Sequence, residues 1–297
     1  MLALLAVSLV AVPARGQDDD SPENLYRTGL VNFGAGKFAE AIPYFARLIE
    51  IFGRESTLQA VIENCYYGLG CSYYNTGQYP ECIETFKKML AQFPKAKALD
   101  EAYFRMAAAY QYENNYEEAI KAYQHLTGTW PNSPFTEDAA FYTALAFMAS
   151  DKSTEAVAAF ETFVTSFPRS DLVPQALVYM ARSYFTAGDY LKALETLESV
   201  GNFTRSLDHL AYANFLAMEI GDAAFEDADF ETALRAFRRV RTNESLIRSQ
   251  KKLVASAEAA LERLRAMKVQ PLEIAQRISD HILRPMKAVF VGKEEII

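Results

Sequence analysis

The stretch "FPKAKALDEAYFRMAAAY", Phe93–Tyr110, returns as "WPNSPFTEDAAFYTALAF" at Trp130–Phe147 and as "FPRSDLVPQALVYMARSY" at Phe167–Tyr184. The three copies align without gaps, and each begins 37 residues after the one before. A fixed step of this length is typical of repeat proteins. The sequence therefore predicts an array of similar units.

Five columns of the alignment keep this step, and each holds one kind of side chain. They are Gly70, Ala107, Ala144 and Ala181; Tyr73, Tyr110, Phe147 and Tyr184; Cys82, Ala119, Ala156 and Ala193; Phe86, Tyr123, Phe160 and Leu197; and the pairs Phe93-Pro94, Trp130-Pro131 and Phe167-Pro168. Because Trp130 falls in the column of Phe93 and Phe167, we interpret it as a packing residue; a ligand contact is the alternative.

Each unit is predicted to be a pair of helices. Tyr103, Met106, Ala107 and Tyr110 recur at helical spacing, and a second apolar stripe begins at Tyr116. Gly77 and Gly188 lie between two such stripes, where a tight turn needs residues tolerant of unusual dihedrals. The proline that closes each unit stops the second helix.

The small columns predict a close approach of the paired helices. We expect the Gly70 column to lie against the Cys82 column, with the aromatic side chains filling the space between neighbouring pairs. A larger residue at Ala144 would then force its pair apart, because overpacking distorts a core.

The pattern resembles the tetratricopeptide repeat. It is carried by Tyr66, Leu69-Gly70, Tyr73, Cys82, Phe86 and Pro94, and again by Tyr103, Met106-Ala107, Tyr110, Ala119, Tyr123 and Pro131. Weaker copies include Gly29, Gly36, Ala41 and Phe45, and near the end Ile220-Gly221, Ala224, Phe230, Ala233 and Phe237. The resemblance implies an all-α fold: a right-handed superhelical solenoid of antiparallel helix pairs, with about six units over residues 24–247.

The linking segments are similar to those of two bacterial envelope families: the lipoprotein of the β-barrel assembly machinery and the periplasmic coordinator of the Tol-Pal system. The step of 37 is longer than the usual 34 of tetratricopeptide repeats. The chain departs from the first family in having no cysteine near the expected cleavage point, and from the second in having no amino-terminal coiled coil.

The two ends are interpreted separately. Residues 1–16 are expected to form a signal peptide, since an apolar run covers Leu2–Val12, although the usual basic start is missing. Residues 17–23 form an acidic leader that we expect to be mobile. In residues 248–297 we expect a long helix over Ser245–Lys268 and another from Pro271, which either cap the array or continue into a longer protein.

Pro43 is expected to kink its helix or remove a hydrogen bond.

Charge and composition exclude some classes of function. The apolar fraction of 51% is typical of an ordered protein. Residues 1–231 carry 16 Lys and Arg against 31 Asp and Glu, which argues against binding nucleic acid. Residues 232–297 carry 14 against 7, a basic excess that we interpret as solvated helix faces; an acidic partner or an anionic membrane surface is the alternative. No stretch is long and apolar enough for a transmembrane segment.

No catalytic, metal or cofactor site is predicted. His125, His209 and His281 are far apart, and the "EDADFE" segment from Glu226 lacks the spacing of a calcium loop. Cys65, Cys71 and Cys82 match neither a disulfide framework nor a zinc pattern, so we expect buried thiols; a Cys71–Cys82 bridge is the alternative.

The binding surface is expected in the groove that the first helices of such arrays line. By analogy with the family, it comprises Tyr67, Tyr74, Phe104, Gln111, Phe141, Met148, Val178, Arg182 and Phe185. Some of these aromatic residues are alternatively core residues. An aromatic row flanked by Glu101 and Asp138 would suit a peptide with apolar anchors and some basic character.

Three functions are compatible with the sequence. The first is a non-catalytic scaffold, periplasmic or secreted, that binds another protein or peptide in outer-membrane protein assembly or envelope organisation. The alternative is a substrate-recruiting or regulatory part of an enzyme whose catalytic part lies elsewhere. A cytoplasmic scaffold with a misread start is a third.

Overall fold

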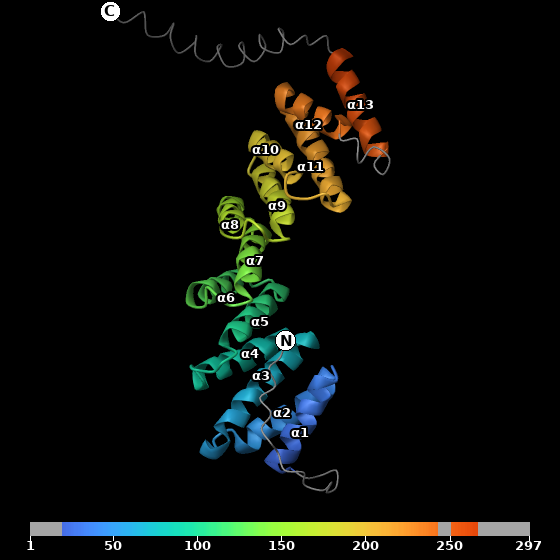
Figure 1. Cartoon of the computed structure of the whole chain (residues 1–297). Coiled ribbons are helices and arrows are strands. Elements are labelled where there is room, and N and C mark those ends of the chain that lie inside the picture. The colour runs from blue at the N-terminus through green and yellow to red at the C-terminus, as the bar shows by residue number, and fades with distance from the viewer. Residues whose placement is uncertain (1–19, 243–250, 267–297) are drawn as a thin grey trace, which may run out of the picture. The chain divides into compact units, whose positions relative to one another are not determined.

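The computed structural model describes residues 20–242 and 251–266. Within these ranges the chain forms α-helices and one short 3-10 helix but no strand, which confirms the predicted all-α fold of paired helices (Figure 1). The predicted signal peptide and the predicted helix from Pro271 lie outside the described residues. The chain divides into two compact units, Met1–Thr136 and Glu137–Ile297.

The first unit contains three helix pairs. They are α1 (Pro22–Gly34) with α2 (Phe38–Phe52), α3 (Gln59–Asn75) with α4 (Tyr79–Gln92), and α5 (Leu99–Tyr112) with α6 (Tyr116–Thr129). The 3-10 helix η1 (Ser56–Leu58) precedes α3. Consecutive helices contact one another, and α3 also contacts α1 and α5. The α2 helix continues through Pro43, which has no N–H to donate to the helix.

The second unit continues the same pairing. It comprises α7 (Thr136–Ala149), which begins one residue before the boundary, with α8 (Ser153–Ser166); α9 (Val173–Thr186) with α10 (Tyr190–Val200); and α11 (Leu207–Glu226) with α12 (Phe230–Thr242). A last helix, α13 (Lys251–Ala266), lies within the predicted Ser245–Lys268 segment and packs on α12 and α11. We call the opening helix of each pair its first helix and the other its second helix.

The small columns make room for a ring on the second helix of the same pair. A Cβ atom added to Gly70 would stand 2.7 Å from two ring atoms of Phe86, which lies 16 residues later. Gly29 faces Phe45 at 2.7 Å and Gly221 faces Phe237 at 2.5 Å in the same way. The sequence predicted that the Gly70 column lies against the Cys82 column, but the atoms nearest to a Cβ at Gly70 belong to the Phe86 ring.

The turn inside each pair depends on one residue in the left-handed conformation. Gly36, Gly77 and Gly188 have φ of 73°, 75° and 81°, and Asn114, Asp151 and Ala228 take the equivalent place with φ of 56°, 58° and 62°. The next N–H then reaches a carbonyl of the first helix five residues earlier, as from Gln78 to Tyr73 at 2.9 Å. The predicted role of the turn glycines is confirmed.

The residue before each closing proline ends the second helix. Phe93, Trp130 and Phe167 have φ of −126°, −124° and −124°, as expected for residues before proline. The ring of Trp130 lies 5.6 Å from Tyr103 and 5.8 Å from His125, and Phe93 lies 6.0 Å from Tyr66, 37 residues before Tyr103. Trp130 therefore has the packing role predicted for it.

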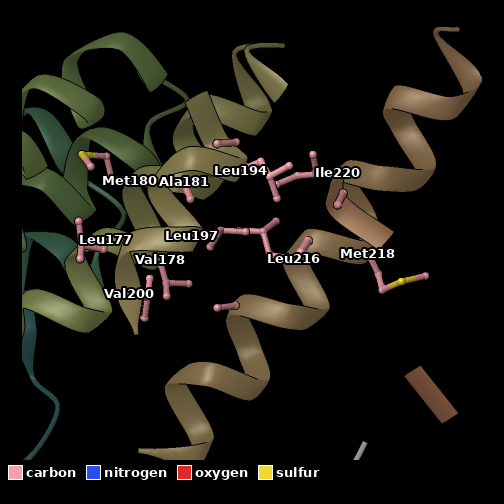
Figure 2. Close-up of a cluster of buried hydrophobic side chains, with 14 of the residues drawn as sticks. Leu177, Val178, Met180, Ala181, Leu194, Leu197, Val200, Leu216, Met218 and Ile220 are labelled. Atoms are coloured by element: carbon pink, nitrogen blue, oxygen red, sulfur yellow. The ribbon is translucent and has the colours of Figure 1, made fainter. Parts of the chain in front are cut away.

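Both units bury apolar side chains. In the second unit the core combines side chains of α9, α10 and α11, among them Val178, Leu197 and Leu216 (Figure 2). In the first unit the core includes Cys65, Cys71 and Cys82, which are all buried and free. The expected buried thiols are confirmed, and the alternative Cys71–Cys82 bridge is not formed.

Candidate protein-binding face

The first helices lie side by side within each unit. In the first unit α3 contacts both α1 and α5, and in the second unit α9 contacts α11. The rings of Phe141 on α7 and Tyr179 on α9 are 6.3 Å apart. We call the outward side of these helices the first-helix face.

Exposed large apolar side chains concentrate on this face. Nine such side chains are exposed in the described residues, and six of them lie on first helices: Val31, Tyr112, Tyr142, Leu207, Tyr212 and Phe215. Second helices carry two, Ile51 and Leu191, and Phe203 lies in a loop. The first helices therefore provide most of the apolar surface on which a partner protein can anchor.

The predicted groove residues of the first unit are half-buried. Phe104 stacks on Phe135, with ring centroids 5.3 Å apart, and lies 5.7 Å from Tyr123. Gln111 accepts a hydrogen bond from the Tyr123 hydroxyl at 2.8 Å, which ties α5 to α6. These side chains thus pack within the unit and still present part of their surface to solvent.

Tyr67 and Tyr74 belong to a polar strip between α3 and α5. Arg105 donates to Glu101 at 2.7 Å, and its guanidinium lies 5.7 Å from the centre of the Tyr74 ring. Burial is the main cause that raises the pKa of Tyr67, and Glu101 adds to it. Burial likewise raises the pKa of Tyr74 to about 12. Both hydroxyls therefore stay protonated at neutral pH and can donate hydrogen bonds.

The predicted groove residues of the second unit fall into two groups, one buried in the core and one half-buried. Phe141 and Val178 are each only 3% exposed, so they belong to the core and offer a partner almost no surface. Phe141 is held there by Phe160 and Phe163 of α8, at 6.1 and 5.5 Å. Met148, Arg182 and Phe185 are half-buried, and Arg182 forms an ion pair with Glu219 of α11 at 2.5 Å.

Four exposed aromatic residues of the first-helix face were not among the predicted site residues: Tyr112, Tyr142, Tyr212 and Phe215. Tyr142 directly follows the predicted Phe141, so only the rotation of α7 distinguishes the two. Tyr212 and Phe215 lie before the repeat columns, on a first helix of 20 residues where its counterpart α9 has 14. The extended apolar pattern before Gly221 was the signal that could have revealed them.

The metal-ligating and nucleophilic side chains of the described residues are dispersed or buried. They contain no group of three or more His, Cys, Asp and Glu side chains able to hold a metal ion. Burial raises the pKa of Cys65, Cys71 and Cys82 to about 12, which removes the nucleophilic thiolate at neutral pH. His125 packs on Tyr103 at 4.4 Å, and His281 lies outside the described residues.

One open depression lies beside the end of α2. It has a volume of about 640 Å³, and its lining includes Ile49, Arg54, Tyr66 and Gln92. The lining also includes Glu50, whose carboxylate forms an ion pair with Arg47 at 3.1 Å. None of the described helices is both long and apolar enough to cross a membrane.

Comparisons with known proteins agree with this architecture. Residues 18–142 match the family model YfiO, described as an outer membrane lipoprotein, and residues 144–204 match a tetratricopeptide repeat model. No curated protein sequence matches the chain significantly.

Solved structures show the same fold at low identity. The MamA RS-1 ArsTM double mutant is 17% identical, with a TM-score of 0.51 over 65% of this chain and 99% of that one. Nearly identical TPR-like repeats of kinesin light chain type from Podosopora anserina are 18% identical, with a TM-score of 0.50 over 63% of this chain and 100% of that one.

Proposed function

We propose that this chain, a tetratricopeptide repeat protein with repeats of the YfiO type, is a non-catalytic scaffold of the bacterial cell envelope that binds a partner protein through its first-helix face. The match of residues 18–142 to an outer membrane lipoprotein family supports the envelope location, and so does the signal peptide predicted over residues 1–16. On this proposal the chain acts in the periplasm, in outer-membrane protein assembly or envelope organisation.

The observation that carries the proposal is the unequal distribution of exposed apolar side chains. Aromatic residues are the usual anchors of protein interfaces, since they bury a large area at a small cost in conformational entropy. In the described helices, each exposed aromatic side chain belongs to a first helix. A scaffold that binds its partner through first helices needs this arrangement, whereas a packing role for these rings would bury them.

Photo-crosslinking in the native organism tests the proposal with matched positions. Benzoylphenylalanine replaces Phe215 on α11, whose side chain is 49% exposed. The control replaces Leu191 on the second helix α10, whose side chain is 47% exposed. We expect discrete crosslinks to a partner protein from Phe215 and Tyr142, and none from Leu191. Equal crosslinking from Leu191 and Phe215, or recovery of the chain only from the cytosolic fraction, would contradict the proposal.

A further inference from the structure

Three tyrosine rings meet where α3, α4 and α5 come together in the first unit. Tyr79 at the start of α4 and Tyr112 at the end of α5 are stacked, with centroids 4.4 Å apart and planes inclined by 4°. The Tyr74 ring meets both edge-on, at 6.0 and 6.2 Å. We call these three residues the tyrosine cluster.

Two of the three rings have a structural role that recurs along the chain. A first-helix aromatic residue packs on the aromatic residue five positions later, across the turn, in Phe33–Phe38, Phe185–Tyr190 and Phe225–Phe230, at 5.5 to 5.8 Å. Tyr74–Tyr79 is the same pair. The fold therefore accounts for Tyr74 and Tyr79 without reference to a partner.

The third ring is particular to this place. The residues that stand two positions before the left-handed turn residue in the other pairs are Gly34, Asn75, Ala149, Thr186 and Glu226, so the other turns pack without such a ring. Tyr112 remains 60% exposed although it stacks on Tyr79. The repeat fold therefore does not require an aromatic residue there.

The charges around the cluster indicate which side chain it would bind. Glu113 directly follows Tyr112 and lies close enough to Tyr79 to contribute, after burial and the neighbouring Tyr112 and Cys82, to its raised pKa. Among the described residues no basic side chain forms an ion pair with Glu113. At the far side of the cluster, the Arg105 guanidinium lies over the Tyr74 ring and is paired with Glu101. Tyr112 and Glu113 offer the same combination of ring and carboxylate to solvent.

We propose that Tyr112 and Glu113 form a docking site for an arginine side chain of the partner protein. The planar guanidinium stacks on the exposed ring of Tyr112 and extends the Tyr79–Tyr112 stack, while the carboxylate of Glu113 accepts its N–H groups. Arginine fits better than lysine, because its flat cation stacks on aromatic rings and donates a fork of hydrogen bonds. This inference rests on the proposed protein-binding function and names the chemistry of one contact.

The test uses the full chain with carbon-labelled tyrosine and a capped peptide that has a single arginine between glycines. We expect the peptide to shift the ring signals of Tyr112 and Tyr79 in a saturable manner. The same peptide with citrulline, which keeps the shape and loses the charge, should bind about fivefold more weakly. Tyr112→Ala should abolish the response and Glu113→Gln should weaken it, whereas Tyr142→Ala, which removes another exposed tyrosine, should leave it unchanged.

Equal shifts with citrulline, or an unchanged affinity in Tyr112→Ala, would overturn the docking site. Circular dichroism of the Tyr112→Ala variant checks that the helices remain, and Glu113→Gln changes the charge without removing any packing. The peptide experiment does not depend on cellular location or on the native partner. Its failure would leave the scaffold proposal intact, while failed crosslinking from Phe215 would contradict the scaffold even if the peptide binds at Tyr112.

Discussion

The hydroxyl of Ser133 donates a hydrogen bond of 2.6 Å to a carboxylate oxygen of Asp100, and Ser170 makes the same contact to Glu137 at 2.5 Å. Both serines lie in the segment after a second helix, and both carboxylates lie at the start of the preceding first helix. The two contacts are related by the step of 37 residues. Each hydrogen bond links the segment that follows a helix pair to the first helix of that pair.

Replacing Ser133 by alanine should therefore lower the free energy of unfolding by about 1–2 kcal/mol, because a half-buried carboxylate loses a donor and the Phe135 N–H loses its acceptor. Urea titration measures the change. Ser170→Ala should have a similar effect. Thr127→Ala is the control, since the Thr127 hydroxyl bonds only to a carbonyl of its own helix. If the serine variants are as stable as the Thr127→Ala control, the contact does not contribute to the free energy of unfolding.

Gly70→Ala should destabilise the first unit by about 1–3 kcal/mol. Its new Cβ would stand 2.7 Å from the Phe86 ring, which is fully buried. Ala144, which has Phe160 at the same spacing, shows that the fold accepts alanine in this column. The loss of stability in Gly70→Ala therefore comes from displacing α4 within a packed unit.

Two further variants make this prediction specific. Gly128→Ala should be neutral or slightly stabilising, because nothing lies within 4 Å of its Cβ position and alanine favours helix. Gly70→Ala combined with Phe86→Leu should recover part of the loss, since Ala181 and Leu197 already occupy the equivalent positions. A Gly70→Ala protein as stable as Gly128→Ala would refute the packing explanation.

Ala228→Gly should stabilise the second unit by about 1 kcal/mol. Ala228 has φ of 62°, a left-handed conformation that costs residues with a Cβ about 1–2 kcal/mol and costs glycine little. Thermal unfolding would show a higher midpoint. The reverse change at the matching turn, Gly188→Ala, should lower the midpoint, because Gly188 has φ of 81°. An unchanged midpoint in both variants would mean that the turns relax freely.

The three cysteines should react slowly with a thiol reagent at pH 8 in the folded protein. Burial raises the pKa of Cys65, Cys71 and Cys82 to about 12, so about one thiol in ten thousand is ionised at that pH, against about a quarter for an ordinary thiol. Absorbance after addition of dithiobis(nitrobenzoate) measures the rate. All three should react quickly once the chain is unfolded; rapid release of one equivalent from the folded protein would contradict this burial.

Much of the fold could be predicted from the sequence because its determinants are local and repeated. The pairing of Gly77 with a turn, and of Pro94 with a helix end, depends on backbone conformations that only certain residues accept. The step of 37 residues then carried the same interpretation from one unit to the next. The reason for the small residue at Gly70 was missed, because its neighbour Phe86 lies on another helix and the spacing alone did not identify it.

The candidate face was predicted less well. Phe141 was expected on the surface and is buried, while its neighbour Tyr142 is exposed. Helical periodicity defines an apolar stripe, but the width of the stripe that the neighbouring pair covers depends on the position of that pair. Tyr212 and Phe215 were missed because they precede the columns that define the repeat.

By itself the sequence determined that this chain would form helix pairs joined by left-handed turns and closed by prolines, because each of these features depends on residues close together along the chain. Only the tertiary structure decided which aromatic rings remain at the surface. A ring at the edge of a helical stripe is buried or exposed according to side chains from other helices, as Phe163 covers Phe141 and as Tyr79 supports Tyr112 without covering it.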